Sequence, residues 1–182
     1  MTRGFLAAAV LFAAAAAQAQ IVPAAKIDTT TALRPTRQAI TAVESLFNTR
    51  LYALGTANDP VDMLGLTRGL YLSNYGAVFS SEISLIITPT LNPFRRTITK
   101  ELHDQVHDRK VNRLPALRAA MLEMVKQAAK DLSQVPDNQQ IVVAVRLGYL
   151  SWEDRTGLPG QIVMSATRKD ALAGAVHSTD EP

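Results

Sequence analysis

Apolar residues between positions 35 and 54 recur every three or four residues, which is the period of an α-helix. They share one face: Ile40, Val43, Phe47, Leu51 and Leu54. Pro35 suits the first turn, because proline lacks the N–H that would be unpaired there. Gly55 suits a left-handed cap at the C-terminus. The pattern therefore predicts a helix over about 35–54.

Two strands are predicted after this helix, over 66–72 and 78–87. In the second strand, alternate positions from Phe79 to Ile87 are mainly apolar and the intervening positions are mixed. One face of that strand is therefore expected to be buried. Turn residues at 73–76 join the two strands, and Pro89 and Pro93 end the second one.

The second half of the chain predicts two more helices and a second hairpin. Segment 95–111 is charged, with apolar residues at four-residue intervals, and reads as a helix. Asn112 can cap a third helix that runs to about 132, with Pro115 in its first turn. Strands over 141–150 and 162–166 enclose a loop at 152–160, in which Glu153, Asp154 and Arg155 read as solvated charges. A short helix follows over 170–175.

This order of elements predicts an α+β fold. We expect a two-layer sandwich, in which an antiparallel sheet of about four strands carries the helices on one face. The predicted organisation is a signal peptide over 1–19, a flexible leader over 20–33, a single α+β domain over 34–176 and a loose tail over 177–182.

The first twenty residues have the pattern of a secretory signal peptide. Arg3 gives a positively charged N-terminal region, and an uninterrupted apolar run extends from Gly4 to Ala17. Ala17-Gln18-Ala19 has the small-x-small pattern of a signal-peptidase cleavage site. The run is shorter than the roughly 20 residues that span a bilayer. We expect cleavage between Ala19 and Gln20, and a periplasmic or secreted protein that does not span a membrane after cleavage.

The amino-acid composition excludes several kinds of chemical site. The 182 residues include no cysteine, which excludes disulfides, a lipid-bearing cysteine, thiol catalysis and thiolate metal sites. The formal net charge of +3 and the 5% aromatic content speak against a nucleic-acid surface. The glycines are scattered and form no phosphate-binding loop, so no cofactor is expected.

His103 and His107 form the sharpest candidate site. Histidines four residues apart on a helix point the same way, so both imidazoles could bind one Zn²⁺. Asp104 stands where metalloproteases of the His-Glu-x-x-His type place a glutamate base. No third ligand lies near by in the sequence. The alternative is a solvated helix face.

No complete catalytic set is found, and no catalytic residue is assigned. The serines between positions 80 and 84 lie in a strand pattern, without the Gly-x-Ser-x-Gly elbow of a nucleophile. Tyr71, Tyr75 and Trp152 are instead candidates for a contact surface, because aromatic residues are favoured at interfaces. The alternative for Trp152 is packing over the sheet edge.

Three segments carry a resemblance: Gly69–Phe79, Leu114–Arg118 and Leu158–Val163. They are similar to parts of an uncharacterised family of predicted exported bacterial proteins. The resemblance covers about two thirds of the chain in scattered pieces. It implies export and carries no activity.

The sequence therefore predicts a non-enzymatic binding or interaction module of the cell envelope, with another envelope protein as its partner. One alternative is a metal-dependent hydrolase that uses His103 and His107. A second alternative is a binder of a cell-wall fragment or lipid, with a pocket near Tyr71, Tyr75 and Trp152.

Overall fold

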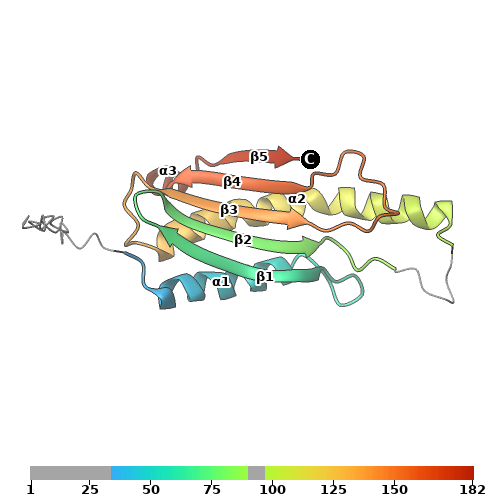
Figure 1. Cartoon of the computed structure of the whole chain (residues 1–182), viewed down its shortest axis with the longest axis horizontal. Coiled ribbons are helices and arrows are strands. Elements are labelled where there is room, and N and C mark those ends of the chain that lie inside the picture. Colours follow the sequence, from blue (N-terminus) through green and yellow to red (C-terminus); the bar gives the residue numbers. More distant parts are fainter. Residues whose placement is uncertain (1–33, 90–96) are drawn as a thin grey trace, which may run out of the picture. The chain divides into compact units, whose positions relative to one another are not determined.

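The computed structural model describes residues 34–89 and 97–182; the predicted signal peptide, its cleavage site and the leader lie outside them. The described part combines five strands with three helices, which confirms the α+β class (Figure 1). In chain order the elements are α1 (Arg37–Tyr52), β1 (Asp62–Leu72), β2 (Gly76–Ser84), α2 (Lys100–Asp131), β3 (Gln140–Leu147), β4 (Gln161–Thr167), α3 (Arg168–Ala173) and β5 (His177–Glu181).

The sheet is mixed rather than antiparallel. Its strands lie in the order β1-β2-β3-β4-β5, and neighbours are antiparallel except for β2 and β3, which run parallel. The long helix α2 returns the chain to the end of the sheet where β2 begins, and such a crossover makes the two strands parallel. The prediction of about four antiparallel strands is therefore corrected to five strands with one parallel pair.

The fifth strand lies where the sequence predicts a loose tail. His177–Glu181 pairs antiparallel with β4, although all five of its residues are exposed. The guanidinium of Arg118 on α2 binds the carboxylate of Asp180 with both of its terminal nitrogens, so a charged contact fixes β5 from the helix side. β5 therefore joins the sheet through backbone pairing and this ion pair, without burying a side chain.

α2 is one continuous helix, whereas the sequence predicts two helices that meet at Asn112. Pro115 lies inside the helix, where its missing N–H removes one backbone hydrogen bond. Val106, Leu114 and Leu117 are buried on both sides of this position. Packing of one apolar stripe against the sheet therefore keeps the helix continuous through the proline.

α1 forms where the sequence predicts it. Thr36 is the N-cap and accepts a hydrogen bond from the Ala39 N–H at 3.1 Å. Gly55 is not the predicted left-handed cap; a side chain there would meet the backbone N of Val61 at 2.6 Å. Glycine is thus needed for a close approach of two chain segments.

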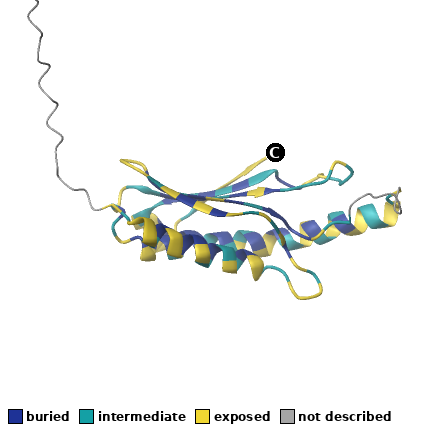
Figure 2. Cartoon of the chain, turned by 60° about the horizontal axis from the view of Figure 1, so that its bottom comes forward, coloured by how far each residue is buried: buried dark blue, intermediate teal, exposed yellow. Residues whose placement is uncertain are grey.

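The core lies between the sheet and the two longer helices. Figure 2 shows these helices on the same side of the sheet. Phe47 of α1 meets Phe79 of β2 edge to face, with ring centroids 5.1 Å apart. Apolar side chains of β2, β3 and β4 complete this layer: Ile83, Ile141, Val143, Val145, Ile162 and Met164. None of the helices in 34–89 and 97–182 is long and apolar enough to cross a bilayer.

Candidate functional sites on the sheet

The face of the sheet that points away from the helices is uncovered in the described part of the chain. Four leucines of β1 are 45–52% exposed: Leu64, Leu66, Leu70 and Leu72. Residues that alternate with them, such as Thr67 and Gly69, are buried against α1. Strand alternation therefore places a row of leucines on the open side.

The apolar row continues across the neighbouring strands. In the strand register Leu70 lies beside Val78, and Val78 lies beside Val142. The next row places Ala144 beside Val163. We call these residues, together with Leu66 and Leu72, the outer face. Within this face the leucines of β1 are about half exposed, whereas Val142 is only 8% exposed, so the exposed apolar surface is concentrated on β1. Contiguous exposed apolar side chains such as these leucines are uncommon on soluble monomers unless they serve an interaction.

A shallow hollow of about 290 Å³ lies within the outer face. Its lining includes Leu66, Arg68, Ser80, Ala144 and Arg146. Arg68 lies between two of the exposed leucines and makes no ion pair within 34–89 and 97–182. Arg146 is 3.8 Å from a carboxylate oxygen of Glu82. The hollow therefore holds an excess of positive charge beside apolar side chains.

Polar side chains of α1 cover part of the outer edge of β1. The carboxylate of Glu44 accepts the Gly69 N–H at 2.7 Å, and the amide oxygen of Asn48 accepts the Thr67 N–H at 2.8 Å. Arg37 donates to the Gly69 carbonyl at 2.9 Å. These bonds occupy backbone groups to which an added strand would have to bind. The face of β1 is thus more accessible to a partner than the middle of its edge.

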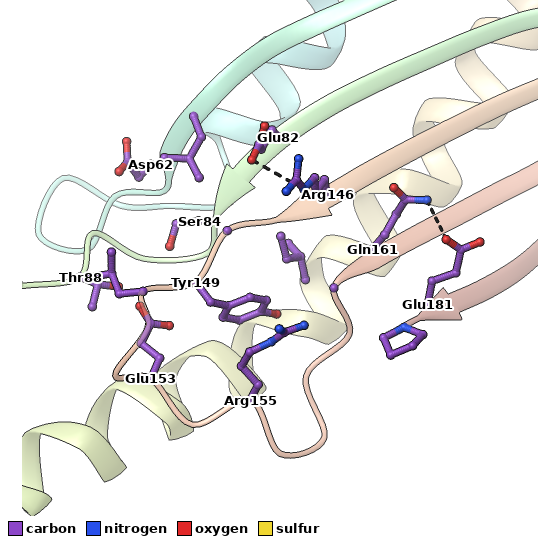
Figure 3. Close-up of a pocket in the computed structure, with 16 residues that line it drawn as sticks. Asp62, Glu82, Ser84, Thr88, Arg146, Tyr149, Glu153, Arg155, Gln161 and Glu181 are labelled. Carbon is purple, nitrogen blue, oxygen red and sulfur yellow. Dashed lines mark hydrogen bonds and ion pairs between the residues drawn. The ribbon is translucent and has the colours of Figure 1, made fainter.

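A second feature is a cavity of about 590 Å³ at the end of the sheet where β2 and β3 finish (Figure 3). We call it the end cavity. Ends of the strands supply Asp62, Glu82 and Arg146, and the loop between β3 and β4 supplies Tyr149, Glu153 and Arg155. Its volume falls within the range of small-molecule sites.

A buried ion pair supports the wall of the end cavity. The Lys110 ammonium, from the middle of α2, donates to Glu153 Oε2, and both side chains are only 1% exposed. Lys110 also donates to the Gly148 carbonyl at 3.3 Å. Burial lowers the pKa of Lys110, while the hydrogen bond and negative charge of Glu153 act to raise it.

Tyr149 lies next to both cations of this region. The Lys110 ammonium is 4.7 Å from the centre of its ring, and the Arg155 guanidinium carbon is 5.1 Å from it. The phenol donates to the Pro159 carbonyl at 2.7 Å. Burial raises the pKa of Tyr149 to about 12. The ring therefore acts as a neutral support for charged neighbours.

Only one of the two carboxylate oxygens of Glu153 accepts a hydrogen bond from the described residues. Oε2 accepts from Lys110, whereas Oε1 is buried and has no hydrogen-bond partner among the described residues. The sequence pattern predicts a solvated loop charge at Glu153, and that prediction is wrong, because the side chain is 1% exposed. The lysine reaches the loop from a helix 43 positions earlier, which local sequence does not reveal.

The two histidines lie on the first half of α2, four residues apart as predicted. His103 Nδ1 is 3.4 Å from a carboxylate oxygen of Asp104, while His107 Nδ1 is 3.2 Å from the Asp154 carbonyl. No group of three side chains in 34–89 and 97–182 is arranged to hold a metal ion. The metal site at His103 and His107 stays a prediction.

The three aromatic candidates for a contact surface are not brought together. Tyr71 and Tyr75 lie by the turn between β1 and β2, and the Tyr71 phenol donates to the Gln139 side chain at 2.8 Å. Trp152 lies in the loop after β3, where its ring centroid is 6.4 Å from that of His103. The length of β2, roughly 26 Å, separates the two groups. A single pocket lined by all three is therefore wrong.

Comparison of the chain with protein-family models, with curated proteins and with solved structures found no match in any of the three. Its function is therefore inferred from the outer face.

Proposed function

We propose that the protein is a non-enzymatic interaction module of the cell envelope that binds another protein through the outer face of its sheet. The observation that carries this proposal is the row of half-exposed leucines on β1. In the strand register Leu70 lies beside the partly exposed Val78 of β2. Exposed apolar patches mark interaction sites in soluble proteins. The signal-peptide pattern of residues 1–19 supports export to the periplasm or the medium.

The outer surface of the whole sheet approaches the size of a specific interface. Strands rise about 3.3 Å per residue and lie about 4.8 Å apart, so five strands of these lengths offer on the order of 600 Å². A standard protein interface buries roughly 800 Å² on each partner. The sheet surface, which includes the outer face, therefore supplies most of the area that a stable contact needs.

The charge on the outer face favours a different protein over a second copy of this chain. Arg68 lies in the middle of the leucine row. A twofold axis through that row would bring two guanidinium groups together, which is unfavourable in an apolar interface. A partner with an apolar surface and one carboxylate, placed in the hollow beside Arg68, satisfies both features.

Site-specific cross-linking in the native host tests this proposal. A photo-reactive amino acid at Leu70 is expected to give one adduct with a second protein, whereas the same amino acid at the exposed Gln38 of α1 gives none. Analytical ultracentrifugation of the purified protein is expected to show a monomer at 100 micromolar. Self-association in that range would assign the face to a second copy and overturn the proposal.

Charge-reversal variants of this protein and of the captured partner then test the role of Arg68. Arg68→Glu is expected to weaken binding of that partner by at least tenfold, because the carboxylate in the hollow then meets a like charge. Changing that carboxylate to lysine in the partner is expected to restore binding to the Arg68→Glu variant. A captured protein that binds the Arg68→Glu and Leu70→Ala variants as tightly as the original would also contradict the proposal.

A further inference from the structure

On the open side of the sheet, the middle strands β2, β3 and β4 carry only small side chains over two successive rows. Residues that lie beside one another in the strand register share a face of the sheet. The first row consists of Ser80, Ala144 and Val163, and the second of Val78, Val142 and Ser165. No side chain in either row is larger than valine. These six residues form a low floor, which we call the trough.

β1 forms a wall along one side of the trough. Leu66 and Leu70 are 52% and 49% exposed, and Arg68 between them lies beside Ser80 in the strand register. The hollow of about 290 Å³ lies against this wall, with Leu66, Ser80 and Ala144 in its lining. Long side chains beside a recessed floor therefore make a concave surface that runs along the strands.

The dimensions of the trough suit an α-helix. Three strands about 4.8 Å apart make the floor roughly 10 Å wide, and a helix with its side chains is about 10–12 Å across. An added strand would instead need the backbone of an edge, and in the middle of the β1 edge Glu44 and Asn48 already occupy backbone groups. A helix on this side would bury the second face of a sheet that carries helices only on its first.

The charges beside the trough indicate which helix fits. Arg68 and Arg146 both line the hollow, together with one carboxylate, that of Glu82. Arg146 is 3.8 Å from that carboxylate, and its side chain is 70% exposed. Arg68 makes no ion pair within 34–89 and 97–182. The remaining positive charge beside the leucines favours a helix with an apolar stripe and an acidic residue next to that stripe.

We infer that the partner of the outer face presents an amphipathic helix, which lies along the strands in the trough with a carboxylate beside Arg68. This inference rests on the proposed function, because it names the part of the partner that the outer face binds. The wall from Leu66 to Leu72 is up to about 20 Å long, since strands rise about 3.3 Å per residue. At a rise of 1.5 Å per residue, the bound helix has about 13 residues in contact.

Mapping of cross-links along the wall tests the inference in the native host. A photo-reactive amino acid is placed at Leu66, Leu70 or Leu72 in three separate variants, and mass spectrometry identifies the residue captured in the partner. Adducts from Leu66 and Leu72 are expected about 11–13 residues apart in one continuous segment, and adducts from Leu70 and Leu72 about four apart. An extended segment would give separations of about six and two.

The outcomes distinguish failure of the helix from failure of the interface. Adducts spaced as on an extended segment, or spread over separate segments of the partner, would keep the protein interface and overturn the helix. Absence of a protein adduct at all three positions would overturn the proposed function, and the inference with it.

Filling the trough provides a second measurement. A synthetic peptide that contains the captured residues is titrated into the purified protein, and binding is followed by fluorescence anisotropy. Ala144→Phe is expected to weaken binding about tenfold or more, because the larger side chain rises from the floor on which the helix packs. Ala42→Phe, at an exposed position of α1, is the matched control and is expected to bind like the original. A folded Ala144→Phe variant that binds the peptide as tightly as the original would overturn the trough as the binding site.

Discussion

Lys110 and Glu153 form an ion pair in the interior, where each side chain is only 1% exposed. The pair connects the middle of α2 to the loop between β3 and β4, and Lys110 holds the same loop through the Gly148 carbonyl. Fully buried ion pairs contribute little net stability, because removing both charges from water is costly. They fix geometry, and here they fix the loop that forms one wall of the end cavity.

Breaking this pair from one side is expected to be strongly destabilising. Lys110→Met leaves the Glu153 carboxylate buried and unpaired, and it should lower the free energy of unfolding by about 3–5 kcal/mol. The double variant with Glu153→Gln buries no charge and should recover most of this loss. Urea unfolding at pH 7, followed by circular dichroism, measures both values. A single variant within about 1 kcal/mol of the original would contradict the buried pairing.

Tyr149 is expected to titrate well above the ordinary range of a tyrosine in the folded protein. Burial raises its pKa to about 12, from an ordinary value of 10.0. Because the folded pKa lies above the unfolded one, the contribution of this group to stability is complete below pH 10 and is lost between pH 10 and about 12. Absorbance of the phenolate band should show a transition near 12 that is absent in Tyr149→Phe. The same spectrum in both proteins would refute the assignment.

The local pattern of apolar and polar residues is sufficient to predict those helices and strands that bury one face and expose the other. The helix α1 and the strand cores of both hairpins were predicted because their apolar residues repeat with the period of the element. β5 carries no such repeat, since all its side chains are exposed. The strand exists because β4 offers an unpaired edge, and that edge is a property of the folded sheet.

The candidate sites were predicted less well, because their residues come from distant segments. Lys110 occupies a position in the apolar stripe of α2, between Val106 and Leu114. A lysine that lies in a buried apolar stripe needs a carboxylate partner. Its presence in the sequence therefore indicates that some glutamate or aspartate elsewhere in the chain is buried with it. Which glutamate it is depends on the fold of the loop after β3. Likewise, Tyr71 and Trp152 are separated by the length of β2, which the order of elements alone did not fix.

Glu44 is expected to stabilise the edge strand through its bond to the backbone of β1. Glu44→Ala leaves the buried Gly69 N–H without its acceptor and removes the partner of Arg37, so a loss of about 1–3 kcal/mol is expected. Ser45→Ala, at the next and exposed position of α1, is the control and should change stability by less than about 0.5 kcal/mol. Hydrogen exchange should accelerate at the Gly69 amide in the first variant alone. Unchanged protection there would contradict this role for the carboxylate.

Two glycines with positive φ are expected to differ greatly in their tolerance of a side chain. Gly76 has φ +137°, and an added Cβ would lie 1.9 Å from the Gln140 carbonyl oxygen, in the strand that pairs with β2. Gly157 has φ +70°, and an added Cβ there meets nothing within 4 Å.

Gly157→Ala should therefore cost only the strain of the left-handed conformation, about 1 kcal/mol. Gly76→Ala adds a clash with backbone that cannot move without breaking the parallel pair, so about 3 kcal/mol or more is expected. Urea unfolding of the two variants side by side distinguishes the contributions. Equal losses would mean that β3 can yield at Gln140, and that the positive φ alone requires glycine at the start of β2.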